Sequence, residues 1–332
     1  MPMVFRINPQ KTLATNGVLF ILLIVISSVG FAQEKSLNER LSELEDRVQK
    51  LESENQKLRG VFSVLKYVNT ARQGQPVEIK NDQQVLARLW VAKEGWGESQ
   101  LADVAAVSKS VAQTLFSEIR PQDCPAIMVV RSDQGPRTLF NRGPNGEYVV
   151  FLNTGNRLWA QLAYQLSHEL GHVLCREIND QAPQHWLEES YCEALSIWTL
   201  ERMAVSWQTA PPYGNWTPYA KNLASYVKSI RDRVDRPTNL GEWYATHRAL
   251  LDDEGYDRPK NRIIADHLAN RGKARPDYLR AFLYLHSGKP TANRIESVLS
   301  SWRSSCPAKL RFVPEDLARL LNVVIDSADR NR

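Results

Sequence analysis

Two histidines and a glutamate stand within five consecutive residues, at a spacing that could bind and use a metal ion. His168, Glu169 and His172 complete the pattern His-Glu-x-x-His, in a stretch whose leucines recur at helical spacing. Residues four apart project from the same face of a helix, so both imidazoles can reach one ion. Glu169 would point beside that ion, where a carboxylate can act as general base on metal-bound water. The pattern predicts a zinc-dependent hydrolase.

The third ligand must come from another part of the chain, because a catalytic zinc ion usually binds three protein side chains and keeps one position open. The metzincin continuation x-x-Gly-x-x-His is excluded, since Cys175 and Ile178 occupy its Gly and His positions. A second predicted helix offers Glu189 and Glu193, which are four residues apart and share a face. Glu189 can therefore bind the ion while Glu193 accepts the free ring N–H of a histidine.

Other ligand sets remain open at this point. Glu188 is the main alternative to Glu189, from which it is rotated by about 100° around the helix. His185 is a further candidate, but it precedes the second helix and lacks a paired acid. A site formed by the two histidines of the pattern and Cys175 would require three side chains of one helix to converge over about 10 Å of rise.

The two segments together resemble a known family. The pattern at 168–172, followed by Trp-Leu-Glu-Glu at 186–189 and by Glu193, is similar to the gluzincins, which include the thermolysin-like peptidases and the zinc aminopeptidases. The resemblance covers residues 147–194. The interval between His172 and Glu189 is shorter than in the best-known gluzincins.

The resemblance implies a zincin-like fold, peptide-bond hydrolysis and a role for each matching residue. His168, His172 and Glu189 would bind zinc, with Glu169 as the general base and Glu193 as the acid that orients a ligand.

The resemblance also implies where a substrate binds. Residues 147–152 would form the sheet edge along which an extended peptide lies. The Gly-x-Met-x-Asn motif that holds a free amino terminus in zinc aminopeptidases is absent, which favours an endopeptidase. Such enzymes stabilise the oxyanion with a Tyr or His. His247 is the catalytic candidate for this role, and Tyr244 is the alternative.

The N-terminal residues 1–32 have the parts of a signal peptide. Arg6 and Lys11 precede the apolar run 18–26, and small residues follow up to Ala32, where cleavage is expected. An uncleaved signal anchor over residues 17–32 is the alternative. Either reading places the rest of the chain in the periplasm or outside the cell, with anchoring to the inner membrane in the second case.

Residues 34–66 have the heptad pattern of a coiled coil. Its seam alternates spacings of four and three and consists of Leu37, Leu41, Leu44, Val48, Leu51, Asn55, Leu58, Phe62 and Leu65. A polar residue such as Asn55 in the seam favours two parallel strands, so a homodimer is expected. The alternative is a single amphipathic helix packed on the domain. Residues 67–75 read as a linker.

The remainder, 76–332, reads as one metallopeptidase-like α+β domain, with an α/β part at 76–155 and a mainly helical part at 156–332. Strands are expected at 126–130 and 147–152. Helical spacing occurs at 84–90, 101–119, 157–177, 186–207, 217–234, 261–270, 276–286 and 314–328.

Charge and cysteine content add weaker constraints. The net charge of +5 is too small to predict a nucleic-acid partner. Cys124 and Cys306 could pair outside the cytoplasm, and four free thiols are the alternative. A concentration of basic residues occurs late in the chain, either as a solvated helical face or as a contact for an anionic partner. Its members are Arg258, Lys260, Arg262, Arg271, Lys273, Arg275 and Arg280.

Two functions follow from these observations. The first is an exported zinc peptidase that cleaves peptide or protein substrates. The second is a catalytically inactive metallopeptidase-like scaffold, tethered by its coiled coil, that binds an envelope partner. The presence of Glu169 beside a complete ligand set favours the enzyme, because a retired site would tolerate its loss.

Overall fold

The computed structural model describes residues 37–81, 84–122, 124–176 and 182–325. The expected signal segment 1–32 lies outside the described residues. None of the described helices is both long enough and apolar enough to cross a bilayer. The chain divides into two compact units, residues 1–58 and 59–332.

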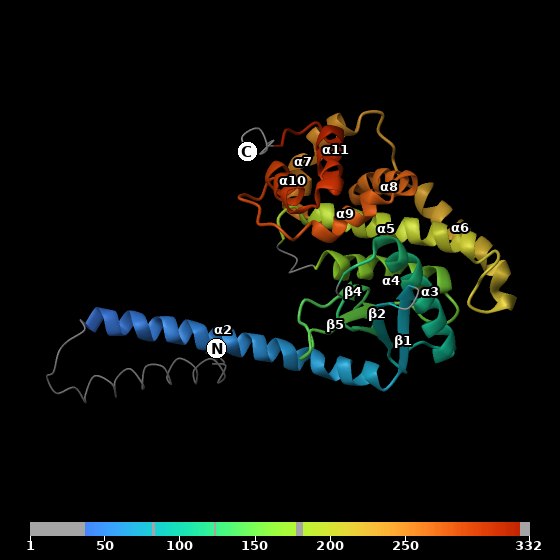
Figure 1. Cartoon of the computed structure of the whole chain (residues 1–332), viewed down its shortest axis with the longest axis horizontal. Coiled ribbons are helices and arrows are strands. Elements are labelled where there is room, and N and C mark those ends of the chain that lie inside the picture. Colours follow the sequence, from blue (N-terminus) through green and yellow to red (C-terminus); the bar gives the residue numbers. More distant parts are fainter. Residues whose placement is uncertain (1–36, 82–83, 123, 177–181, 326–332) are drawn as a thin grey trace, which may run out of the picture. The chain divides into compact units, whose positions relative to one another are not determined.

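The first described element is the helix α2 (Leu37–Arg72), which begins in the first unit and ends in the second (Figure 1). The predicted seam runs along it, and five of its apolar side chains, Leu41, Val48, Leu51, Leu58 and Phe62, are exposed to solvent in the single chain. Leu51, Leu58 and Phe62 are 63%, 58% and 68% exposed.

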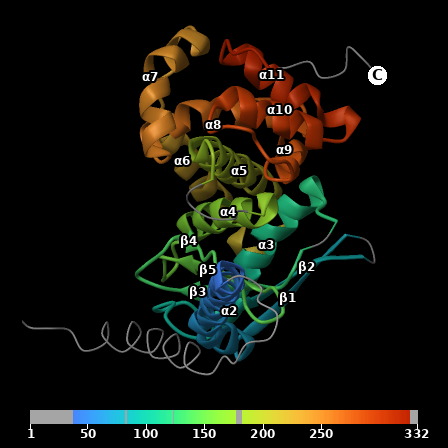
Figure 2. The same ribbon diagram turned by 90° about the vertical axis from the view of Figure 1, so that its left-hand side faces the viewer.

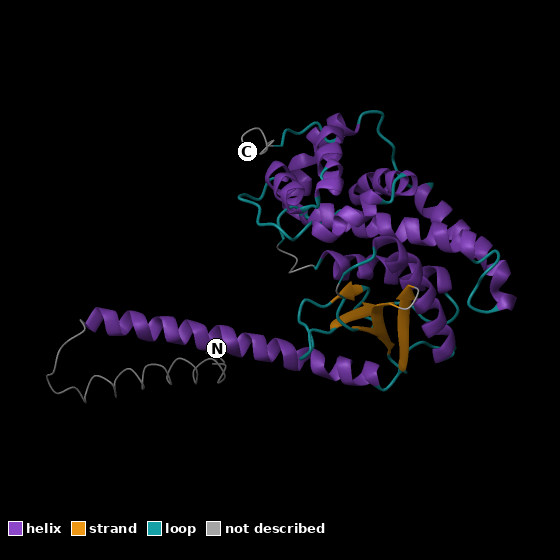
Figure 3. Ribbon diagram, viewed as in Figure 1, coloured by secondary structure: helices purple, strands orange, loops and turns teal. Residues whose placement is uncertain are grey.

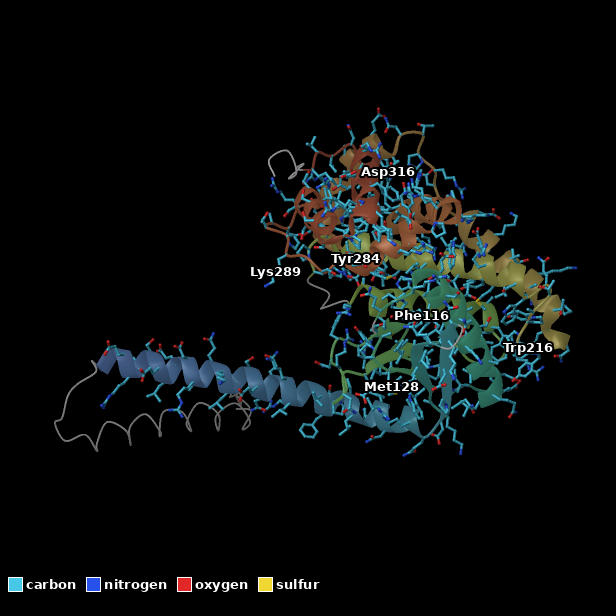
Figure 4. All side chains as sticks on the ribbon, viewed as in Figure 1. Phe116, Met128, Trp216, Tyr284, Lys289 and Asp316 are labelled. Carbon is cyan, nitrogen blue, oxygen red and sulfur yellow. The ribbon has the colours of Figure 1, made fainter. Side chains whose placement is uncertain are left out.

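The last part of α2 packs against the sheet through a different face. Val64, Val68 and Ala71 are buried there against one side of the sheet, which includes Met128 and Phe151 (Figure 4). The helix therefore continues through residues 67–72, and the predicted linker 67–75 is reduced to the two residues that follow α2.

An ion pair also fixes the end of α2. The Arg72 guanidinium lies 2.8 Å from a carboxylate oxygen of Glu147, which is buried. Partial burial raises the pKa of Glu147, but hydrogen bonds from Asn145 and Arg72 outweigh it and lower this pKa to about 2.

The sheet is small and mixed, as predicted (Figure 3). Its spatial order is β1-β2-β3-β5-β4, and the bounds are β1 Gln75–Asn81, β2 Gln84–Val91, β3 Ile127–Arg131, β4 Arg137–Thr138 and β5 Tyr148–Leu152. β2, β3 and β5 are parallel, while β1 and β4 are antiparallel to their neighbours. β5 therefore lies inside the sheet, and the expectation that 147–152 forms its edge is wrong. β4 is the edge.

The segment 84–90, expected to be helical, is the strand β2. Its apolar run is too short to distinguish a buried strand from a helix by spacing alone. Pairing with both β1 and β3 decides the outcome, because these ladders satisfy its backbone groups on both sides.

The helix α3 (Leu101–Ile119) covers the face of the sheet opposite α2. It connects the parallel strands β2 and β3, and Phe116 lies in its buried stripe (Figure 4). In both Figure 1 and Figure 2, α4 (Trp159–Cys175) lies between the sheet and α5 (His185–Ser206), and α8 (Arg258–Ala274) lies beyond α5. The chain is α+β. α4 packs on the sheet, and α5 packs on α4.

The rest of the domain is helical, as expected. Its elements are η1 Gly214–Tyr219, α6 Ala220–Arg231, α7 Leu240–Glu254, α9 Asp277–Ala281, η2 Phe282–Tyr284, α10 Ile295–Ser305, η3 Ala308–Leu310 and α11 Phe312–Leu320. The helices α7 and α10 were not predicted. The sequence does contain signals for α7. The Asn239 side chain caps its start by accepting hydrogen bonds from two backbone N–H groups, and Gly255 ends it with a positive φ of 61°.

Most residues of the basic cluster form ion pairs inside the domain. Arg262 pairs with Glu193, Arg271 with Asp316, and Arg280 with Glu118. The four cysteines are free thiols, so the expected pair Cys124–Cys306 is wrong.

Candidate metal centre

The His-Glu-x-x-His pattern lies on the helix α4, where mostly buried apolar side chains surround it. Leu162, Leu166 and Leu170 are buried in the core around it, and His172 is itself buried. The helix ends at Arg176, whose left-handed φ of 60° turns the chain away. Tertiary packing thus fixes both imidazoles on a rigid helix.

The helix α5 supplies the carboxylates, and its close approach to α4 depends on a glycine. A Cβ on Gly171 would lie 2.6 Å from Sγ and 3.1 Å from Cα of Cys192. Only a residue without a side chain permits this contact. Glu188, Glu189 and Glu193 are all buried beside it.

Glu189 faces both histidines of the pattern. One of its carboxylate oxygens lies 3.3 Å from Nε2 of His168, and the other lies 3.6 Å from Nε2 of His172. One donor atom from each of the three residues falls within 4.8 Å of the others. These side chains, whose ligand roles were implied by the family resemblance, form a group that could hold a metal ion.

Glu188 approaches His172 from the opposite side. Its Oε1 lies 2.6 Å from Nδ1 of His172, whereas Nε2 of the same ring faces Glu189. Its Oε2 lies 2.6 Å from Nε2 of His286, and Cys175 Sγ donates to Oε1 at 3.3 Å. Burial would raise the pKa of Glu188, but these imidazoles hold it well below its usual range. Glu188 therefore orients His172 rather than competing with Glu189.

Cysteines extend the cluster of possible metal donors. Two further groups with donor atoms within 4.8 Å combine Glu188 with His172 and Cys192, and with Cys175 and His286. Both share Glu188, whose oxygens already accept hydrogen bonds from the imidazoles. In the group centred on Glu189, Nε2 of His168 and Nε2 of His172 lie 3.3 and 3.6 Å from the two carboxylate oxygens, and this group could hold an ion.

Glu193 lies near the other histidine of the pattern, His168. Its Oε2 lies 3.8 Å from Nδ1 of His168 and also accepts a hydrogen bond from the Tyr164 hydroxyl. Arg262 donates to its second oxygen at 2.7 Å. Burial and the nearby Glu193 raise the pKa of Tyr164 strongly, so this hydroxyl stays a donor. Sequence reasoning missed Tyr164, although it stands four residues before His168 on the same helix face.

Glu169 lies beside the cluster and points to the sheet. The Thr138 hydroxyl donates to its carboxylate at 3.0 Å and lies 3.1 Å from its backbone oxygen. Burial raises the pKa of Glu169, and His172 and His168 offset this rise only in part. Thr138 belongs to β4, so the sheet edge and the expected general base are adjacent. No local sequence signal identifies Thr138.

His185 is closer to the centre than the sequence indicated. It is the first residue of α5, and its Nε2 lies 3.3 Å from the Glu189 oxygen that also faces His172. Burial would lower the pKa of His185, but Glu188 and Glu189 raise it to about 10. His185 therefore has paired acids, contrary to the expectation from the sequence.

The expected oxyanion residues lie elsewhere. His247 is on α7, where Nδ1 is 2.8 Å from the Trp243 backbone oxygen and the ring stacks on the Trp243 indole. Among the described residues, none of its hydrogen bonds or ring contacts reaches the group around Glu189. Tyr244 is 1% exposed and packs on Trp186.

A small hollow opens beside the cluster instead. It is lined by His168, Glu189, Glu193, Tyr256, Arg258 and Asn261. The last three residues come from the start of α8 and the turn before it; of these, the sequence singled out only Arg258, as a member of the basic cluster.

Buried imidazole and carboxylate donors of this kind bind divalent transition metals. The cluster therefore combines a group that could hold a metal ion with a buried carboxylate, Glu169, beside it. The chain matches no protein-family model, no curated protein and no solved structure among those compared.

Replacing Gly171 tests whether helix packing sets the site. Gly171→Ala should force α5 away from α4, because its Cβ meets the backbone of Cys192. We expect a loss of about 1–3 kcal/mol in the free energy of unfolding and a zinc affinity lower by on the order of tenfold or more. Urea unfolding and chelator competition measure both. Gly214→Ala is the control, since a Cβ there has no atom within 4 Å. Unchanged affinity in Gly171→Ala would contradict the role of this contact.

Proposed function

We propose that this chain is an exported zinc-dependent peptidase of the gluzincin type, acting as an endopeptidase. The observation that carries the proposal is the convergence of two Nε2 atoms, from His168 and His172, on the two oxygens of Glu189. The oriented rings support it, because each has an acid at its other nitrogen.

The donor set fits zinc. Two imidazoles and one carboxylate form the ligand set of many catalytic zinc sites, and such sites leave one position open. The side chains of His168 and Glu189 are 12% and 10% exposed, so the ligand set reaches solvent only through a narrow opening. When bound, zinc would supply Lewis acidity and would lower the pKa of a water molecule to roughly 7.

The protein's own residues perform the proton transfers. Glu169 takes the proton of the attacking water and later delivers it to the leaving amine. Thr138 holds one oxygen of its carboxylate in place. Tyr256 replaces His247 as the candidate that stabilises the oxyanion, because it lines the hollow and its hydroxyl is a neutral donor whose pKa burial raises.

The edge strand β4 supports binding of an extended peptide. One side of β4 pairs with β5, and its Thr138 contacts Glu169. A substrate strand added to the free side of β4 would pass the general base. This placement replaces residues 147–152 as the proposed binding edge.

Export and dimerisation complete the proposal. The leader in residues 1–32 directs the chain to the periplasm or the outside, with or without retention as an inner-membrane anchor. The exposed seam of α2, with Asn55 in it, pairs with a second copy as a parallel coiled coil.

Glu169→Gln tests the catalytic proposal. The variant keeps the metal-binding side chains and loses only the proton acceptor. We expect an unchanged zinc content and a peptide-cleavage rate lower by on the order of 10²–10⁴-fold. Cleavage of a peptide library by the parent should stop on chelation and return with zinc.

Glu98→Gln, at an exposed acid outside the cluster, serves as the control and should retain the parent rate. A Glu169→Gln protein as active as the parent would rule out the mechanism. Zinc binding by a parent that cleaves no peptide would support the alternative of an inactive scaffold.

The dimer is tested by charges placed in the seam. Leu51→Glu together with Leu58→Glu should convert the chain from dimer to monomer in sedimentation equilibrium, because like charges would meet across the seam. Ser53→Glu with Gln56→Glu, on the outer face of the same helix, should leave the dimer intact. A parent that sediments as a monomer would contradict the proposal.

A further inference from the structure

Asn261 is a buried polar side chain without a partner. It is 3% exposed, and neither Oδ1 nor Nδ2 has a hydrogen-bond partner among the described residues. A buried amide that makes no hydrogen bond destabilises the fold, so native structures rarely keep one without a use. This amide lines the hollow beside the metal centre, together with His168 and Glu189.

Arg258 stands three residues before Asn261 on α8, so the two side chains share a helix face. It lines the same hollow, and its guanidinium lies 5.7 Å from the centre of the Tyr256 ring. No described carboxylate lies within ion-pair distance of it. The neighbouring Arg262, by contrast, is paired with Glu193 at 2.7 Å.

The acids of the hollow are already engaged. Glu193 accepts hydrogen bonds from Arg262 and Tyr164, and Glu189 faces the imidazoles. An anionic group that reaches the rim of the hollow therefore meets the exposed guanidinium of Arg258, with the unpaired amide of Asn261 beneath it.

We propose that Arg258 and Asn261 form a subsite that binds a carboxylate of the substrate next to the metal centre. The inference rests on the proposed peptidase function and adds a substrate class to it. A guanidinium presents planar paired donors that match a carboxylate. The Asn261 amide matches the adjoining peptide group, since Nδ2 can donate to an oxygen while Oδ1 accepts an N–H.

The carboxylate can belong to an acidic side chain or to the C-terminus of the peptide. Two pairs of peptides distinguish these sources on the zinc-loaded full-length protein. One pair shares a sequence that ends in a carboxylate or a carboxamide. The other pair carries Glu or Gln next to the cleaved bond. The parent should show a kcat/KM at least about tenfold higher for the carboxylate member of one pair.

Arg258→Gln should bring this ratio close to one. Lys273→Gln, which removes an exposed cation from the same helix outside the hollow, should preserve it. Cleavage of all four peptides with no preference for a carboxylate would overturn the subsite while leaving the peptidase proposal intact.

Asn261→Leu separates binding from folding. The substitution keeps the approximate size of the side chain and removes the unpaired amide. Resistance to urea should stay the same or rise, while the carboxylate preference falls. A less stable variant that keeps the full preference would assign Asn261 a structural role and overturn its part in the subsite.

A binding measurement does not depend on turnover. N-acetylglycine and N-acetylglycinamide are titrated into Glu169→Gln protein and followed by ligand NMR. The acid should bind at least about tenfold more tightly than the amide, and adding Arg258→Gln should remove the difference. If the parent cleaves no peptide, the peptidase proposal fails and this difference still decides the subsite. Equal binding of the two probes overturns it.

Discussion

The contact between Gly171 on α4 and Cys192 on α5 is the constraint on which the candidate metal centre depends. A single added methyl group would meet the backbone of the opposite helix. Because α4 carries the imidazoles and α5 carries the carboxylates, any separation of the two helices weakens every pairing between them. The glycine inside the His-Glu-x-x-His pattern therefore serves packing, while its neighbours serve chemistry. The sheet beneath α4 adds Thr138, which ties Glu169 to the edge strand β4.

Buried charge in the cluster is balanced group by group. An uncompensated buried charge is strongly destabilising, typically by about 3–5 kcal/mol. Each of the three buried acids of α5 is accordingly matched by donors: Glu188 by His172 and His286, Glu189 by His168, His172 and His185, and Glu193 by Tyr164 and Arg262. A hydrogen bond to Glu188 fixes the His172 ring by Nδ1, Glu193 lies 3.8 Å from Nδ1 of His168, and both rings present Nε2 to Glu189. Asn261 is the exception at the hollow, because its buried amide has no hydrogen-bond partner among the described residues, and the exposed Arg258 lies beside it.

Periodicity predicted the elements that carry the chemistry, because α4, α5 and β5 are long or strongly apolar and their signals are local. The expected bounds of α4 and α5 differ from the observed ones by one or two residues. The segment 84–90 was misassigned because a short apolar run fits both periods, and only its pairing with β1 and β3 decides. The choice between Glu188 and Glu189 depends on the rotation of α5 against α4, which no local pattern encodes. Thr138, Arg262 and Asn261 reach the site through long-range packing, and their sequence neighbourhoods give no sign of it.

Anomalous diffraction at the zinc edge, from crystals of the zinc-loaded protein, locates the bound ion. We expect one strong peak in contact with Nε2 of His168, Nε2 of His172 and a carboxylate oxygen of Glu189. Glu188 should remain hydrogen-bonded to the other nitrogen of His172. A peak among Cys175, Glu188 and His286, or no peak between α4 and α5, would show that the proposed ligand set is wrong.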